Sequence, residues 1–319
     1  VEVPALAREL GVARVFVKEE SSRLGLPAFK VLGASYAVSR ALSTRMGTDE
    51  ALDFGVLRTQ APAVRLVAAT DGNHGRAVAR VARLLGLVAE IFTPAGITRA
   101  AKDAIEAEGA HRVELDAGYD DVVRAAAASV GDDAVLIQDT SWEGYEEIPG
   151  WIVDGYSTLL AEADRQAADA GAALFDIVFV PVGVGSLAEA VVRHYRSGTS
   201  KPSIVSVEPA TAPALLSSLH AGRAVTVPTS TTIMAGLNCG TPTEAGWPTL
   251  RDGIDRALTV TDAQAATAVH DLAALGIDAG PCGAATLAGA REIGSLPPEA
   301  TVLLLSTEGR AANPLPEDS

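Results

Sequence analysis

Short apolar runs alternate with longer amphipathic stretches along most of this chain. The apolar runs are rich in β-branched residues and are bounded by Gly, Pro or Asp, which predicts buried strands. The predicted strands are residues 13–18, 65–70, 88–94, 134–139, 176–182, 203–209 and 301–307. The predicted helices are residues 35–46, 75–85, 99–108, 120–129, 150–170, 187–195, 262–275 and 283–293. This alternation indicates an α/β fold in which helices cover both faces of mostly parallel sheets.

Residues 225–256 interrupt this pattern. The stretch holds many Thr, Pro and Gly residues and has little periodicity, so we predict a long ordered loop. Loops of this length within compact domains are often functional.

The composition limits the classes of partner. The formal net charge is −15, which argues against nucleic acid because phosphate backbones require clustered Lys and Arg. No apolar run approaches the ~18 residues of a membrane span and no secretory signal is visible, so we expect a cytoplasmic protein without a membrane partner. Cys239 and Cys282 form no CxxC pair and have no His cluster nearby, which predicts no metal site. Whether the two thiols pair with each other stays open.

One predicted strand ends in a glycine-rich turn, VPVGVGSLAEAVV (residues 180–192), that leads into a helix. Four backbone N–H groups of this turn would face whatever lies in front of the helix, which favours a bound phosphate. They belong to Gly183, Val184, Gly185 and Ser186. The alternative is an ordinary strand-to-helix turn that uses glycine for its positive φ. The turn has neither a Walker lysine nor the three-glycine dinucleotide spacing.

Other polar groups also follow predicted strands. The turn ATDGNHGRAVA carries Asp71 and Asn73, which could serve a ligand or simply cap the next helix. We expect His74, in the same turn, to be structural. Asp139 and Ser306 each lie at the end of a strand, where ligands of parallel sheets bind. An Asp in that place can equally begin a turn.

Lys30 lies in the apolar segment PAFKVLGAS. One reading is a surface lysine whose stem covers apolar surface while its amine reaches water. The other is an amine kept among apolar groups for chemistry, because desolvation disfavours the ammonium and makes the amine nucleophilic.

The order of these features is similar to that of the fold type II pyridoxal-phosphate (PLP) enzymes, the tryptophan synthase β-like family. Four segments resemble the diaminopropionate ammonia-lyases within it: ESSRLGLPAFKVLGAS, ATDGNHGRAVA, QDTSWEGYEEIPGWIVDGY and TTIMAGLNCGTP. The resemblance extends over nearly the whole chain. It implies a PLP cofactor and two interleaved three-layer α/β domains.

The resemblance also implies roles for single residues. Lys30 would form the internal aldimine with PLP and act as a base. Asn73 would hydrogen-bond the ring hydroxyl, and the cofactor phosphate would lie on the glycine-rich turn of residues 183–186. Ser306 would contact the pyridine nitrogen, with the next two residues, Thr307 and Glu308, as alternatives.

Asp71 and Asp139 indicate the substrate. Two carboxylates would attract a cationic amine at the β-carbon and repel an anionic side chain such as a phosphate. With the resemblance, this predicts α,β-elimination of L- and D-2,3-diaminopropionate to pyruvate and two ammonia. Lys30 would take the α-proton of the L-isomer and Asp71 that of the D-isomer. Asp139 would orient the β-amine or share the acid–base work.

Two other functions stay open. A serine or threonine dehydratase has the same fold and expels a hydroxyl. A non-catalytic protein that binds a phosphate ligand is the alternative from another class. Lys30 distinguishes the enzymes from it, because a phosphate-binding protein needs no buried amine beside its phosphate site.

The resemblance implies interleaved domains. Residues 1–44 and 151–319 would form the larger, cofactor-binding domain, and residues 45–150 a smaller, mobile domain that closes over the amino-acid substrate. It also implies a homodimer.

Overall fold

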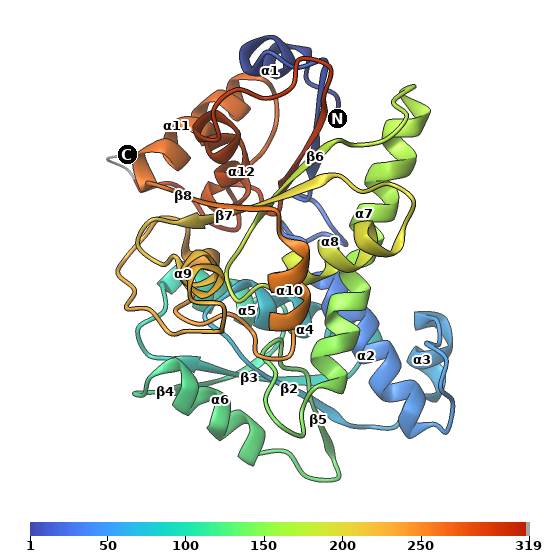
Figure 1. The fold of residues 1–319 in the computed structure, drawn as a ribbon. Coiled ribbons are helices and arrows are strands. Elements are labelled where there is room, and N and C mark those ends of the chain that lie inside the picture. The colour runs from blue at the N-terminus through green and yellow to red at the C-terminus, as the bar shows by residue number, and fades with distance from the viewer. Residues whose placement is uncertain (317–319) are drawn as a thin grey trace. The chain divides into compact units, whose positions relative to one another are not determined.

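The computed structural model describes residues 1–316. The chain divides into two compact units, each built around its own parallel sheet (Figure 1). The larger unit comprises Val1–Phe29 and the chain from Tyr156 onward, and the smaller unit is Lys30–Gly155. The predicted α/β class with parallel sheets is confirmed.

The larger unit holds a five-stranded sheet in the order β1-β9-β6-β7-β8, and every neighbouring pair is parallel. Its strands are β1 (Arg14–Glu19), β6 (Ile177–Pro181), β7 (Ser203–Pro209), β8 (Arg256–Val260) and β9 (Thr301–Ser306). The central strands are buried on both faces, which explains their continuous apolar sequences.

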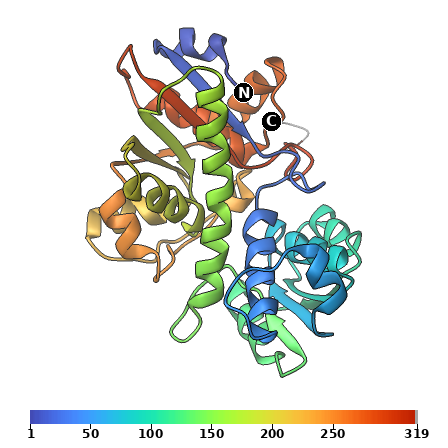
Figure 2. The same ribbon diagram turned by 90° about the vertical axis from the view of Figure 1, so that its right-hand side faces the viewer.

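Helices cover this sheet. They are α1 (Pro4–Leu10), α7 (Glu147–Asp169), α8 (Ser186–Ser197), α9 (Ala214–Ala221), α10 (Trp247–Gly253), α11 (Asp262–Ala274) and α12 (Pro281–Glu292), with the short 3-10 helix η1 (Ala235–Leu237). One core cluster joins α1, α11 and α12 to alternate residues of the strands, and α8 packs on β6 and β7. Figure 2 shows α7 as one long helix, and it contains the boundary between Gly155 and Tyr156.

The smaller unit holds a parallel sheet in the order β4-β3-β2-β5. Its strands are β2 (Arg65–Ala69), β3 (Val88–Pro94), β4 (His111–Leu115) and β5 (Ala134–Leu136), and its further helices are α2 (Val31–Arg45), α3 (Phe54–Gln60), α4 (Asn73–Leu85), α5 (Arg99–Glu106) and α6 (Tyr119–Ala128). In Figure 1, α6 lies on one face of this sheet and α4 and α5 on the other, which gives three layers.

Two strands, β4 and β8, were not predicted from the sequence. Each lies at one edge of its sheet, and unlike the mostly buried edge strands β1 and β5 its residues are mostly exposed or half-buried, so it lacks an apolar run. The helices that were not predicted, α1, α3, α9 and α10, are only seven or eight residues long, too short for a clear helical period. The predicted loop of residues 225–256 carries η1 and α10.

The division into units assigns α2 to the smaller unit, because α2 packs on α4. From the sequence, residues 30–44 and 151–155 were predicted to belong to the larger domain instead. The cofactor-binding role of the larger unit and the mobility of the smaller one stay predictions. Within residues 1–316, none of the helices combines the length and the apolar character that crossing a membrane requires.

Candidate active site

Lys30 immediately precedes α2, at the start of the smaller unit. Its Nζ donates a hydrogen bond to Asp139 Oδ2 at 2.6 Å, and the two side chains are 22% and 8% exposed. The apolar sequence neighbours therefore do not leave the amine alone in an apolar setting. Tertiary structure brings a buried carboxylate to it from a segment that is more than a hundred residues away in the chain.

Asp139 lies just beyond β5 and beside His74, whose Nδ1 is 3.7 Å from Asp139 Oδ2. Burial opposes the ionisation of Asp139, but charge on His74 and Lys30 and the hydrogen bond from Lys30 lower its pKa. Burial also lowers the pKa of His74, so this imidazole is neutral near pH 7. We therefore assign the cation that stabilises the Asp139 carboxylate to Lys30.

The tautomer of His74 follows from its second contact. His74 Nε2 lies 2.7 Å from the carbonyl oxygen of Ile137, an acceptor only, so Nε2 carries the proton in the neutral ring. This hydrogen bond fixes the ring on the strand that leads to Asp139. The expectation that His74 is structural fits this contact.

Asp71 lies in the turn between β2 and α4, close enough to feel the charges of Asp139 and Lys30. The loss of solvation around Asp71 and the negative charge of Asp139 raise its pKa. The residue as a whole is exposed at the surface of the turn, so water moderates this rise. Asp139 is thus the more acidic of the two carboxyl groups, while Asp71 holds its proton more readily. This difference suits acid–base catalysis.

Asn73 is the first residue of α4 and lies in the same turn. Neighbouring parallel strands β2 and β5 end at one edge of their sheet, so the turn after β2 and the segment after β5 meet there. The structure therefore brings Lys30, Asp71, Asn73 and Asp139 to one edge of the smaller unit.

The glycine-rich turn of the larger unit joins β6 to α8. Gly185 has φ of 106°, a left-handed conformation that favours glycine. A Cβ on Gly183 would come within 2.8 Å of the carbonyl oxygen of Gly236, so the turn packs closely on η1. Ser186 begins α8, a helix of twelve residues, and the first N–H groups of such a helix favour an anion. That the cofactor phosphate binds there stays a prediction.

Ser306 ends β9, and its side chain is 2% exposed. Its Oγ has no hydrogen-bond partner among residues 1–316, although buried hydroxyls in proteins are nearly always paired. Glu308 differs, because its Oε1 accepts hydrogen bonds from the Cys282 N–H and the Asn313 side chain, both at 3.2 Å. Ser306 is therefore the better candidate for a partner that the protein itself does not supply.

Two residues near the carboxylates were missed from the sequence, Tyr119 and Gln138. The Gln138 Nε2 donates to the Tyr119 hydroxyl at 3.1 Å, and its Oε1 accepts from the Ala69 N–H. Burial and the charges of Asp139 and Asp71 raise the pKa of Tyr119, which places it beside the site. No sequence signal marked it, because Tyr119 follows the half-exposed edge strand β4.

Neither thiol forms the disulfide that the sequence left open: Cys239 and Cys282 are not joined. Burial raises the pKa of Cys282. Within the described part of the chain, no three His, Cys, Asp or Glu side chains gather where they could hold a metal ion.

Comparison with known proteins defines the class. The family "Pyridoxal-phosphate dependent enzyme" matches residues 1–308, and the chain belongs to this family. Among curated proteins, it is 39% identical to the diaminopropionate ammonia-lyase of Salmonella typhimurium over 283 residues, which covers 84% of this chain and 70% of the relative. The predicted family and its PLP cofactor are thereby confirmed.

Comparison with solved structures supports the same family. The chain is similar to the Escherichia coli diaminopropionate ammonia-lyase in complex with D-serine, with a TM-score of 0.88 and 33% identity over 97% of this chain and 84% of that one. It is also similar to the same enzyme in complex with an aminoacrylate-PLP azomethine reaction intermediate, with a TM-score of 0.86 and 34% identity over 97% and 83% of the two chains.

Each unit, taken by itself, has features that fit the family's cofactor. The smaller unit presents a partly buried amine at Lys30, and the larger unit presents the N-terminus of α8 behind a turn too tight for a side chain at Gly183. The unpaired, buried hydroxyl of Ser306 is the third feature, because a pyridine nitrogen would complete its hydrogen bonding.

Proposed function

We propose that this protein catalyses the α,β-elimination of 2,3-diaminopropionate, in its L- and D-forms, to pyruvate and two ammonia. One observation carries the proposal: in a PLP-dependent enzyme, Lys30 pairs with the buried Asp139, and Asp71 lies close enough for their charges to act on it. The relatives that act on diaminopropionate, at 39% identity, support it.

The carboxylates favour a diamino acid over a hydroxy amino acid. The β-amine of diaminopropionate is an ammonium near pH 7, and the Asp139 carboxylate, which pairs with the Lys30 ammonium, can pair with that ammonium in its place. A dehydratase substrate carries a neutral β-hydroxyl and gains much less from an ionised partner. We therefore place the serine or threonine dehydratase second.

We propose that residues of both units bind the cofactor. We assign covalent attachment to Lys30, the phosphate to the backbone of Gly183, Val184, Gly185 and Ser186, the ring hydroxyl to Asn73 and the pyridine nitrogen to Ser306. Bound PLP supplies the electron sink that stabilises the carbanion formed when the α-proton leaves. A hydroxyl partner such as Ser306 suits an elimination, which does not need a fully protonated pyridine.

The protein's own groups handle the protons. The Lys30 amine accepts the α-proton of the L-isomer, and the Asp71 carboxylate accepts that of the D-isomer. The Cβ–N bond then breaks, and its electron pair leaves with ammonia, so the β-nitrogen must be protonated beforehand. Asp139 keeps it protonated by pairing with the ammonium. The released enamine takes up water and yields pyruvate and the second ammonia.

The remaining parts of the proposal come from the resemblance. We propose that the enzyme acts as a homodimer in the cytoplasm, that the larger unit binds most of the cofactor, and that the smaller unit moves during turnover. Light scattering of the purified protein tests whether it is a dimer.

Pyruvate release from L- and D-diaminopropionate, L-serine and L-threonine tests the function. We expect the highest kcat/KM with diaminopropionate, and we expect Lys30→Ala to abolish both turnover and the borohydride-reducible absorbance of bound PLP. Lys102→Ala is the matched control, because Lys102 is 18% exposed and pairs with Glu114 in the same unit. Faster turnover of serine or threonine would favour the dehydratase. A protein that stays colourless with PLP would contradict every enzymatic reading.

A further inference from the structure

The segment that leads into Lys30, residues 20–29, lies along the end of β9. Three backbone hydrogen bonds join the two: Glu20 N–H to Ser306 O (2.9 Å), Phe29 N–H to Thr307 O (3.0 Å) and Gly309 N–H to Pro27 O (2.9 Å). All of these residues belong to the larger unit, and Lys30 follows Phe29 directly in the chain. The backbone that delivers Lys30 and the backbone that carries Ser306 are therefore held in one register.

This segment contains a strained turn. Arg23 and Leu26 exchange two backbone hydrogen bonds, at 2.8 and 2.9 Å, around Leu24 and Gly25, whose φ angles are 50° and 76°. Two positive φ angles belong to the primed hairpin turns, which normally carry Asn, Asp or Gly at the first position. Leu24 is the only residue other than glycine with positive φ within residues 1–316. A left-handed conformation is unfavourable for leucine, so other contacts must hold the turn.

Burial of Leu24 does not hold it, because that side chain is 52% exposed. Arg23 does. Its guanidinium donates two hydrogen bonds to Glu20, at 2.9 and 2.6 Å, and two to Glu162 of α7, at 2.9 and 2.6 Å. Glu20 is 2% exposed, and Arg23 and Glu162 are each 21% exposed. Forked pairs of this kind are among the strongest and most directional in proteins.

Lys18 completes the charge balance. Its Nζ lies 2.7 Å from Glu162 Oε2, so two cations face two carboxylates. Arg23 first, and then Lys18, hold the pKa of Glu162 at about 2 despite its partial burial. The cluster of Lys18, Glu20, Arg23 and Glu162 is thus fully paired, and neither the proposed substrate chemistry nor the cofactor contacts use it.

We propose that Arg23 is a positioning residue for the cofactor amine. Because Arg23 holds Glu20 and Glu162 at once, it fixes the strained turn and the register of residues 26–29 on the end of β9. The backbone position of Lys30, the residue just before α2, is thereby fixed as well. The inference rests on the proposed roles of Lys30 and Ser306. Loss of the double fork should loosen this segment and weaken PLP binding, although Arg23 is not among the residues assigned to the cofactor or the substrate.

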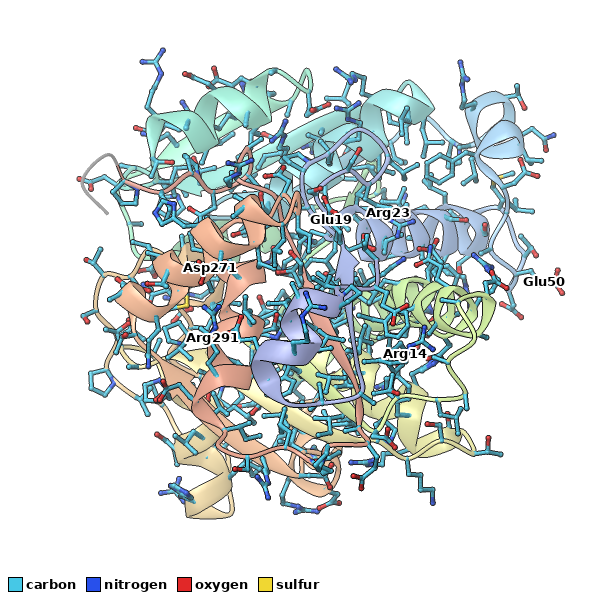
Figure 3. All side chains as sticks on the ribbon, turned by 90° about the horizontal axis from the view of Figure 1, so that it is seen from above. Arg14, Glu19, Arg23, Glu50, Asp271 and Arg291 are labelled. Atoms are coloured by element: carbon cyan, nitrogen blue, oxygen red, sulfur yellow. The ribbon has the colours of Figure 1, made fainter. Side chains whose placement is uncertain are left out.

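The test uses Arg23→Lys and Glu162→Gln. Lysine keeps the charge but cannot span two carboxylates with a planar fork. Glutamine keeps the size of Glu162 and removes its charge. Arg14→Lys is the matched control: Arg14 also forks onto one carboxylate, Glu2, at 2.8 and 2.7 Å, and is 23% exposed. Figure 3 labels Arg14 and Arg23, which lie apart.

Two measurements report positioning apart from turnover. Hydrogen exchange of the apoprotein follows the amides of Leu26, Ala28 and Phe29, and titration of the apoprotein with PLP gives its Kd. We expect Arg23→Lys to speed exchange in this segment and to raise the Kd for PLP about tenfold. Glu162→Gln should do the same to a lesser degree, and the KM of the reconstituted enzyme should change little. Arg14→Lys should leave exchange in this segment and the Kd unchanged.

An unchanged Kd for PLP in Arg23→Lys would overturn the inference. An increase of this Kd in Arg14→Lys as large as that in Arg23→Lys would also overturn it. If Arg23→Lys does not fold, the same two outcomes are judged on Glu162→Gln. Failure of the proposed function shows itself differently. A wild-type protein that binds PLP through Lys30 but releases no pyruvate from diaminopropionate would refute that function and leave the positioning role to be decided by exchange and Kd.

Discussion

At the residue scale, the two carboxylates beside Lys30 differ in their protonation. Asp139 is buried, and its pairing with the Lys30 ammonium lowers its pKa. Asp71 is more exposed and carries a raised pKa, chiefly from lost solvation and from the charge of Asp139. The difference lets one group bind a cation at all working pH values, while the other exchanges protons. The D-isomer is the substrate for which Asp71 is proposed as the base.

Asp71→Asn should therefore remove activity toward the D-isomer, by about 100-fold or more in kcat, and spare most of the activity toward the L-isomer. In the wild type, D-isomer activity should fall on acidification at a higher pH than an ordinary aspartate would give, because Asp71 must be ionised to act as a base and its pKa is raised. Parallel kcat profiles for both isomers check this. Asp133→Asn, an exposed aspartate of the same unit, is the control. Full D-isomer activity in Asp71→Asn would refute the assignment.

At the element scale, helix α9 has an unusual N-terminal cap. Glu208 in β7 is fully buried and accepts hydrogen bonds from the Leu215 and Leu216 N–H groups, at 2.7 and 2.8 Å. Burial raises the pKa of Glu208 from 4.5 to about 7, although the backbone donors favour its charged form. The cap therefore titrates near neutral pH.

This cap predicts a pH dependence of folding. Because the folded-state pKa lies above the unfolded value, the contribution of Glu208 to stability is complete below about pH 4.5 and is lost as the pH rises through 7. Relative to Glu208→Gln, the wild type should lose up to about 3 kcal/mol of unfolding free energy over that range, at about 1.4 kcal/mol per pKa unit. Urea unfolding of both proteins at about pH 5 and about pH 8 measures it. A constant difference between them would contradict the prediction.

At the scale of the whole molecule, the cofactor is expected to add to stability. PLP binds the folded protein through backbone groups that exist only in the fold, so its binding free energy adds to the free energy of unfolding. With free PLP about 100-fold above its Kd, the gain is about 3 kcal/mol. Denaturant unfolding with and without PLP measures it. Lys30→Ala should lose most of this gain and Lys102→Ala should keep it, whereas equal midpoints for apo and holo wild type would show that PLP does not bind the native state.

Much of the fold followed from local patterns. The predicted strands are the ones whose residues are mostly buried, including the edge strands β1 and β5, because burial gives them continuous apolar runs. The edge strands β4 and β8 could not be predicted, because half-exposed strands carry mixed residues. The glycine-rich turn was visible because Gly185 needs positive φ and Gly183 has no room for a Cβ.

The sequence by itself determined the alternation of strands and helices, the positions of the turns and the family of PLP-dependent enzymes. These depend on residue type and spacing along the chain, which are local properties. Only the tertiary structure decided which groups meet: Lys30 with Asp139, Glu308 with the start of α12, and Arg23 with both Glu20 and Glu162. These pairs join residues from distant segments, and no local pattern records the geometry that a packed fold imposes on charges.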